Sequence, residues 1–185
     1  MSGKMPPGQR YISSWPVRTA EDAPDIDPKD WTLEITGLIK TPKTLNIEEV
    51  HAMSTVEVEG DFHCVESWTV PDNRWRGVRV RDLIDESELQ QDAKFALFHS
   101  PGGYSSEIDL ECLMDDETIL AWERNGEPIP FEHGYPLRLI VPSRYAYKSV
   151  KWVSKIELVD KDIRGYWEAR GYHPVADVWK NERYG

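Results

Sequence analysis

The fold is decided by two stretches, Pro136-Leu-Arg-Leu-Ile-Val141 and Val150-Lys-Trp-Val-Ser-Lys-Ile-Glu-Leu-Val159. Both are rich in apolar and β-branched residues, and both are long enough for a strand but short for a helix. They are the two clearest strand signals in the chain. Working outward from them, shorter alternating runs predict further strands at residues 31–35, 55–59 and 93–99.

Helix signals are few and short. Asn46 followed by Glu49 has the pattern of a capping box, with apolar residues spaced for one face of a helix behind it. Residues 80–84 and a turn capped by Asp109 predict two more brief helices. Asn125-Gly126 favours a β-hairpin. We therefore expect an α+β protein, a single mixed domain of mostly short β-strands with a few short helices.

The chain length of 185 residues allows one domain. Residues 1–30 are rich in proline and end in an acidic stretch, which is typical of an extended arm rather than a folded unit. We expect these residues to form an extended N-terminal arm packed on the domain, and residues 31–185 to form the domain itself. The sequence shows no internal repeat and no low-complexity segment.

The charge and hydropathy of the chain exclude several partners. A formal net charge of −11 argues against nucleic acid, whose phosphates are bound by basic surfaces. No apolar run is long enough to span a membrane, and the first residues do not have the pattern of a signal peptide. We expect a cytoplasmic protein with no membrane insertion. The two cysteines, Cys64 and Cys112, do not form the pattern of a secreted disulfide framework.

Residues 133–156 form an acid-free basic segment in an acidic protein. The segment has no Asp or Glu, although about four would be expected from 33 acidic residues spread evenly over the chain. Its cations are Arg138, Arg144, Lys148, Lys151 and Lys155. Such a segment predicts either a local anion site, with backbone N–H groups and cations around an oxyanion, or a solvated basic face.

Cys64 lies where a strand is expected to end, in Asp61-Phe-His-Cys-Val-Glu-Ser-Trp68. A free cysteine is most often a small buried hydrophobic residue, and thiolate chemistry would need a nearby cation or metal. Zinc is one alternative, since His63, His99, His133 and His173 are available. The spacing is poor for zinc, because adjacent strand residues point to opposite faces and no C-x₂-C pair exists.

Cys112 lies on the apolar side of its predicted helix and is expected to pack. Nucleophilic triads, Walker loops and dinucleotide-binding glycine motifs are absent from the sequence.

Several motifs together resemble the sulfite-oxidase-like family of molybdopterin-binding oxidoreductases. Phe62-His-Cys-Val-Glu-Ser-Trp68 and the following Asn73-Arg-Trp-Arg-Gly-Val78 are similar to that family's molybdenum-binding segment. His133-Gly-Tyr-Pro-Leu-Arg138 and Tyr145-Ala-Tyr-Lys-Ser-Val-Lys-Trp152 are similar to its pterin-binding stretch. The early Pro6-Pro-Gly-Gln-Arg10 and the aromatic ending from Gly165 onward resemble small prokaryotic members.

The resemblance implies a sulfite oxidase molybdopterin-binding-domain-like fold and a molybdenum–molybdopterin cofactor (Mo-MPT). Cys64 would be the catalytic residue and the protein's metal ligand, and a soft thiolate suits this metal. The residues implied to bind the cofactor are His99, His133, Arg138, Ser149, Val150 and Lys151. Tyr11 to Ser13 are implied as contacts from the arm. The acid-free basic segment would then face an anionic cofactor.

The family also implies a reaction, namely two-electron oxygen-atom transfer on a small-molecule substrate, with a separate electron-transfer partner. The substrate would be an S-oxide or N-oxide to be reduced, or an oxyanion to be oxidised. Sulfite oxidases have an Arg a few residues after the ligand Cys, whereas residues 65–70 contain none. We therefore do not expect a true sulfite oxidase.

Two other functions stay open, a cofactor-free binding or interaction protein that retains the fold, and a zinc protein. Trp68, Tyr104 and the aromatic tail, residues 166–184, are expected to pack, with a pocket rim or a docking surface as the alternative.

Overall fold

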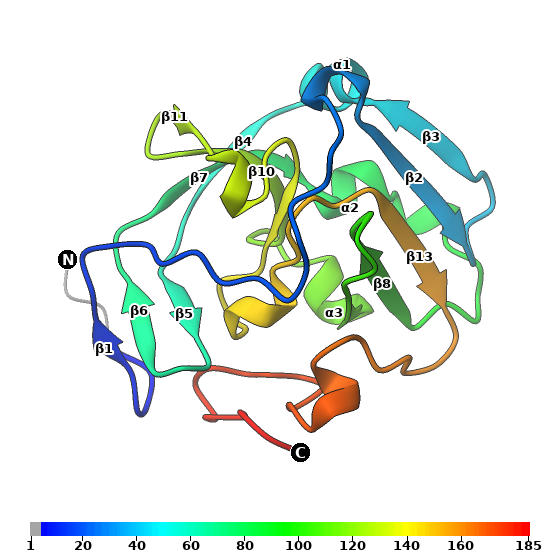
Figure 1. The fold of residues 1–185 in the computed structure, drawn as a ribbon. Helices are drawn as coiled ribbons and strands as arrows, with labels where there is room; N and C mark the ends of the chain where they lie inside the picture. Colours follow the sequence, from blue (N-terminus) through cyan, green and yellow to red (C-terminus); the bar gives the residue numbers. More distant parts are fainter. Residues whose placement is uncertain (1–4) are drawn as a thin grey trace.

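The computed structural model describes residues 5–185 as three β-sheets joined by short helices and loops (Figure 1). The first five-stranded sheet has the order β3 (Lys43–Asn46), β2 (Thr32–Gly37), β13 (Lys155–Val159), β8 (Phe95–His99) and β9 (Ser105–Asp109). The second has the order β11 (Glu127–Pro128), β10 (Ile119–Arg124), β7 (Arg74–Arg79) and β4 (Val56–Glu59), with β12 (Arg138–Ile140) also paired to β10. The third has the order β1 (Arg10–Tyr11), β6 (Trp68–Val70) and β5 (Phe62–Cys64).

Short helical segments connect the strands. The α-helices are α1 (Ile47–His51), α2 (Val80–Leu83) and α3 (Leu110–Leu113). The 3-10 helices are η1 (Pro28–Asp30), η2 (Glu86–Glu88), η3 (Phe131–His133), η4 (Ala146–Lys148) and η5 (Glu168–Arg170). The α+β class is confirmed, with many short strands and few helices.

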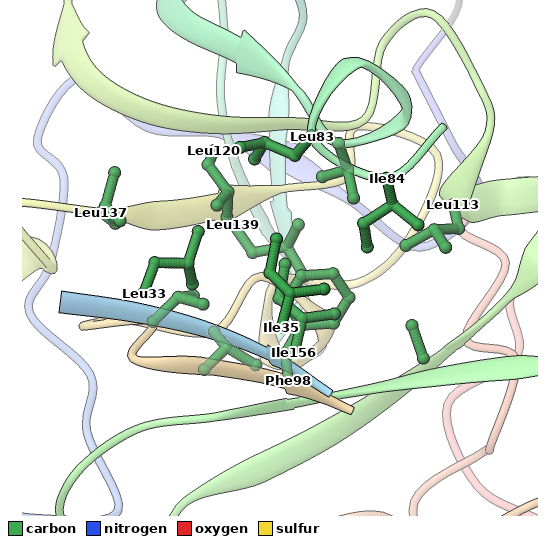
Figure 2. Close-up of a cluster of buried hydrophobic side chains, with 14 of the residues drawn as sticks. Leu33, Ile35, Leu83, Ile84, Phe98, Leu113, Leu120, Leu137, Leu139 and Ile156 are labelled. Carbon is green, nitrogen blue, oxygen red and sulfur yellow. The ribbon is translucent and has the colours of Figure 1, made fainter. Parts of the chain in front are cut away.

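Two of the sheets pack face to face over the main core. Figure 2 shows Leu33, Ile35, Ile156 and Phe98 of the first sheet facing Leu120 and Leu139 of the second. All of these side chains are fully buried. Alternate residues of a strand point to opposite faces, so Ile119 and Ala121 of β10 enter a second cluster on the other side of the same sheet. The second sheet is therefore buried on both faces at β10, whose first four residues, 119–122, are all apolar and buried.

The second cluster positions Cys64. It includes Phe62, Cys64 and Trp68 from the small third sheet together with Trp75 and Ile140 from the second. Residues 64–67 form the turn between β5 and β6, in which the Ser67 N–H donates to the Cys64 carbonyl at 3.1 Å. The thiol therefore lies at the end of a short strand that packs in one cluster with the aromatic side chains of Trp68 and Trp75.

Both ends of the chain run across the domain near this sheet. In Figure 1 the blue N-terminal arm passes from β1 over the face of the molecule to β2. The red C-terminal tail runs along the bottom of the molecule in this view. β1 pairs in parallel with β6, which ties the arm to the strand after Cys64. Of the arm, residues 1–4 lie outside the described residues.

Local signals in the sequence are confirmed where they depend on neighbouring residues alone. Asn46 and Glu49 form the capping box of α1, and Asp109 caps α3 by accepting from the Cys112 N–H at 2.8 Å. Asn125 and Gly126 both have positive φ in the turn between β10 and β11. Turn residues of this type set the hairpin register through their own backbone preference.

The strand predicted over residues 150–159 is wrong at its first half. β13 begins only at Lys155, and Trp152 has a φ of 53°, which interrupts an extended strand. Val150 and Val153 are buried, but their backbones bond irregularly, to the Leu139 N–H and the Leu137 carbonyl. The apolar pattern there reports burial rather than ladder pairing, and the irregular path carries Lys151 to the site described next.

Candidate cofactor site

A cavity of about 310 Å³ lies between the small sheet, the arm and the tail. A cavity of this size is in the range of ligand and cofactor sites. Its lining comes from widely separated parts of the chain: Trp15, Pro16, Arg18, Thr19, Ala20, Glu21, Phe62, Cys64, Val65, Glu66, Trp68, Tyr104, His133, Arg138, Ala146, Tyr147, Ser149, Lys151, Trp167 and Tyr172.

The acid-free basic segment supplies one end of the cavity, which we call the cation end: His133, Arg138, Ser149 and Lys151. Arg138 lies on β12 and is only 6% exposed. Its Nη1 donates to the His133 carbonyl at 2.5 Å, whereas its buried Nε has no hydrogen-bond partner among residues 5–185. A buried guanidinium N–H without a partner is costly and points to an anionic ligand.

The basic groups of the cation end are buried and close together, and both conditions lower their pKa values. Burial lowers the pKa of Arg138 to about 9. Burial and then the charge of Arg138 lower the pKa of Lys151 to about 8. Burial, followed by Arg138 and Lys151, lowers the pKa of His133 to about 4. A bound anion would reverse these effects, because an opposite charge favours the charged form of each base.

Cys64 lies at the other end, which we call the thiol end: Arg18, Cys64, Val65, Glu66 and Trp68. Burial raises the pKa of the Cys64 thiol to about 11, with the Glu66 charge acting in the same direction. Without a metal the sulfur is therefore a protonated thiol at neutral pH. A coordinated metal displaces such a proton outright.

The turn after Cys64 is held from both ends of the chain. Gln9 of the arm donates to the Cys64 carbonyl at 3.1 Å. Arg183 of the tail donates to the Val65 carbonyl and, at 3.0 Å, to the Ser67 hydroxyl. Together these bonds fix the backbone on either side of the Cys64 side chain, and neither donor is near Cys64 in sequence.

Glu66 places a carboxylate beside the thiol. Its Oε2 lies 4.0 Å from the Cys64 Sγ. The same oxygen accepts from the Arg18 Nε at 2.7 Å and from the Trp68 Nε1 at 3.2 Å. The Arg18 guanidinium lowers the pKa of Glu66, so the carboxylate is ionised at neutral pH.

The arm forms one wall of the cavity. The Trp15 ring stacks on the His133 ring, with centroids 3.8 Å apart and planes 11° from parallel. Glu21 accepts from the Ser100 hydroxyl and, at 2.9 Å, from the Tyr104 N–H. These contacts hold both ends of the segment 15–21 against the wall of the cavity.

A buried ion pair fixes the wall formed by η4. Lys148 and Glu168 are 2% and 0% exposed, and the Lys148 Nζ lies 2.6 Å from the Glu168 Oε1. The Ser106 hydroxyl donates to the same oxygen at 2.5 Å, and Lys148 also donates to the Pro174 carbonyl at 2.6 Å. The pair joins the tail to the loop that supplies Tyr147 and Ser149 to the cavity.

The structure brings together five of the predicted site residues, namely Cys64, His133, Arg138, Ser149 and Lys151. His99 and Val150 do not line the cavity. His99 lies on β8 in the first sheet, where its Nε2 is 3.1 Å from the Glu157 Oε2. The Val150 side chain packs in the main core.

The arm does reach the cavity, but through residues 15–21 rather than through Tyr11 to Ser13. Trp68 and Tyr104, which the sequence assigned to packing, are partly or fully buried and also line the cavity. Trp167 and Tyr172 of the tail line it as well, so the tail is more than a surface covering. No residue pattern marked these positions, because only the tertiary path of the chain places them.

A zinc site finds no support in the arrangement of side chains. Within residues 5–185, no three His, Cys, Asp or Glu side chains gather in a way that could hold a metal ion. His63 hydrogen bonds to the Thr69 hydroxyl at 2.9 Å instead of pointing to Cys64.

None of the helices in the described part of the chain is long and apolar enough to cross a membrane.

Known proteins are similar to this chain in sequence and in fold. The model of the family described as "Oxidoreductase molybdopterin binding domain" matches residues 20–167, and the chain belongs to this family. An uncharacterized oxidoreductase, YuiH, of Bacillus subtilis is 36% identical over 99% of this chain and 93% of its own. The mitochondrial sulfite oxidase of Drosophila melanogaster is 30% identical over 87% of this chain but only 33% of its own.

A solved structure supports the fold independently. The sulfane dehydrogenase SoxCD from Paracoccus pantotrophus superposes with a TM-score of 0.68 at 24% identity, over 75% of this chain and 40% of that one. The sulfite oxidase molybdopterin-binding-domain-like fold predicted from the sequence is confirmed.

Proposed function

We propose that this protein is a molybdopterin-dependent oxidoreductase that catalyses two-electron oxygen-atom transfer on a small molecule. The observation that carries the proposal is one cavity with a single buried thiol at one end and a buried, incompletely bonded Arg138 at the other. A pterin cofactor needs both features, a soft ligand for molybdenum and cations for its phosphate.

The residues fit such a cofactor on their own chemistry. Cys64 would hold molybdenum through its thiolate. His133, Arg138 and Lys151 would face the pterin and its phosphate, where Arg138 Nε would gain the acceptor that it lacks among residues 5–185. The Ser149 hydroxyl accepts from the Val141 N–H at 3.2 Å, and its own hydrogen can donate to the cofactor. Val150 and His99 stay predicted contacts, the first through its backbone.

When bound, the cofactor supplies the oxygen-atom exchange, in which an oxide XO, two electrons and two protons give X and water, or the reverse. The chain orients the cofactor through the cation end and encloses the reacting centre with Trp68, Tyr104 and Trp167. The two electrons must be exchanged with a second redox centre, and we include in the proposal a separate electron-transfer protein as partner. The proposal also keeps the cytoplasmic location expected from the sequence.

A cofactor-free binding protein explains the site less well. Such a protein would retain a desolvated Arg138 beside Lys151 without an anion to offset their repulsion. Replacing buried charges of this kind with apolar residues is often stabilising. The zinc alternative lacks a third ligand near Cys64, as described above for residues 5–185.

Metal analysis of the protein tests the proposal directly. Protein produced with molybdate and a complete pterin pathway should contain about one molybdenum per chain and a pterin that fluoresces after oxidation. Cys64→Ser should reduce the molybdenum content at least about tenfold. Cys112→Ser is the matched control, because Cys112 is also buried but packs in the main core. Stoichiometric zinc, or full molybdenum in Cys64→Ser, would contradict the proposal.

A further inference from the structure

Arg183 joins the tail to the turn that carries Cys64. Its Nη1 donates to the Val65 carbonyl, 118 residues away in sequence, and at 3.0 Å to the Ser67 hydroxyl. Its Nη2 donates at 3.3 Å to the carbonyl of Gly8 in the arm, where a Cβ would lie only 3.1 Å from this nitrogen. One side chain of the tail therefore bonds both to the turn and to the arm.

The guanidinium of Arg183 is itself held in place. Its Nε donates to the Asn181 Oδ1 at 2.8 Å, and the same oxygen accepts from the Tyr145 hydroxyl at 3.1 Å. The Tyr145 side chain is fully buried, and the guanidinium carbon lies 5.0 Å from the centroid of its ring. A planar guanidinium that is fixed in this way loses little conformational freedom when it binds two acceptors at once. Arg183 is thus preorganised by groups that do not belong to the turn.

The turn needs support from outside, because its backbone is strained. Ser67 has a φ of 71°, in the left-handed region that residues other than glycine rarely adopt. The Ser67 N–H donates to the Cys64 carbonyl at 3.1 Å, but this bond does not orient the Val65 carbonyl or the Ser67 hydroxyl. Arg183 binds both of these groups. A strained residue persists where the surrounding structure holds it, and Arg183 supplies part of that hold.

Arg183 also brings a positive charge close to the Cys64 sulfur. The charges of Arg18, Glu66 and Arg183 all act on this sulfur, and that of Arg138 reaches it from the cation end. Arg18 and Glu66 lie 2.7 Å apart, so their charges largely offset each other. The acceptors of Arg183 named above are uncharged, and Arg183 is the one of these cations that binds the backbone of the turn.

We propose that Arg183 is a positioning residue for the molybdenum ligand. It holds the Cys64–Ser67 turn so that the thiolate faces the cavity, and it keeps a positive charge beside that thiolate. This role rests on the proposed function and adds to it a residue that lies outside the cavity lining. A cation near the sulfur favours the reduced, more negatively charged state of a bound metal, and so raises its reduction potential.

Hydrogen exchange in cofactor-free protein tests whether Arg183 holds the turn. In Arg183→Met the Ser67 amide should exchange about tenfold faster than in the wild type, because the turn opens locally once the charged hydrogen bonds are lost. The Leu139 amide, which donates to the Val150 carbonyl in the main core, should exchange at an unchanged rate. An equal acceleration of both amides would mean global destabilisation. That result, or an unchanged rate at Ser67, overturns the role of Arg183.

Arg170→Met is the matched control from the same tail. The Arg170 Nη1 donates to the Tyr166 carbonyl at 2.7 Å, and its guanidinium carbon lies 3.7 Å from the centroid of the Tyr166 ring. The control therefore removes a positive charge, a carbonyl bond and a ring contact without touching the turn. Exchange at Ser67 should be the same in Arg170→Met as in the wild type.

A redox titration of the holoprotein gives a readout that a merely structural role would not move. Arg183→Met should lower the midpoint potential of the bound molybdenum, and Arg183→Lys should restore most of it, because Lys keeps the charge without the planar fork. The molybdenum content of Arg183→Met should also fall about tenfold. Arg170→Met should leave both quantities unchanged. A wild-type potential in Arg183→Met overturns the positioning role.

The two measurements separate this role from the proposed function. If the wild type binds no molybdenum when a complete pterin pathway is present, the proposed function fails, and exchange at Ser67 still decides whether Arg183 holds the turn. If the wild type binds molybdenum but Arg183→Met exchanges at Ser67 like the wild type, the proposed function stands and the role of Arg183 is overturned.

Discussion

The two ends of the cavity are built in different ways. The cation end comes from one segment, residues 133–151, and its charged groups are largely buried. The thiol end joins the β5–β6 turn, the arm and the tail, and its ion pair is half exposed. Buried charges are strongly coupled to a ligand, whereas exposed charges are screened. The cation end should therefore set how tightly the cofactor is held, and the half-exposed ion pair of the thiol end should contribute little to that affinity.

The largest expected effect comes from the wall formed by η4, which the buried Lys148–Glu168 pair holds. Lys148→Met leaves the Glu168 carboxylate buried with one fewer cation, and should lower the free energy of unfolding by about 3–5 kcal/mol. Urea denaturation of both proteins measures the difference. Lys180→Met is the control, because the Lys180–Asp177 pair has a lysine that is 68% exposed and should contribute less than about 1 kcal/mol. Equal losses in the two variants would mean that the buried pair does not hold this wall.

Arg138→Met should separate cofactor retention from stability. We expect molybdenum and pterin retention to fall about 10–100-fold, because the phosphate loses its buried guanidinium. In cofactor-free protein the same change should raise the Tm, since it removes a desolvated cation. Arg144→Met is the control from the same segment, because Arg144 pairs with Asp109 and Asp177 outside the cavity. Retention of cofactor by Arg138→Met would break the distinction between the two ends.

His133 should make the cofactor-free protein sensitive to mild acid. The folded-state pKa of His133 is lowered from 6.5 to about 4, so the unfolded chain binds more protons between these values. Stability should therefore fall as the pH decreases from 6.5 to 4 and level off below it. Between pH 7 and pH 4.5 the wild type should lose about 2 kcal/mol more than His133→Gln. Parallel losses would show that His133 titrates normally.

The sequence predicts the cation end far better than the rest of the site. Arg138, Ser149 and Lys151 lie close together in the chain, so the absence of acids around them is visible before the fold is known. The prediction that Cys64 is a metal ligand depended on the family motif, because a lone cysteine otherwise predicts only a buried side chain. Trp15, Arg18 and Trp167 enter the cavity only through the path of the arm and the tail, which no local pattern encodes.

The fold shows the same division between local and long-range signals. The capping box at Asn46 and the Asn125-Gly126 hairpin were predicted, since neighbouring residues decide both. The stretch from Val150 to Ser154 was predicted as strand, although Trp152 turns the chain away from the sheet. His99 has the composition of a site residue, but its strand lies in the first sheet, paired with β13 and β9.

The order in which the lining residues occur along the chain has a consequence for biosynthesis. The ribosome produces Cys64 long before Trp167 and Tyr172, which complete the cavity around it. Until that point the cysteine is an exposed thiol with an ordinary pKa near about 8.5, open to oxidants and to soft metal ions. Packing of these tail residues removes this exposure, and only the assembled cavity offers a pocket into which the cofactor can be loaded.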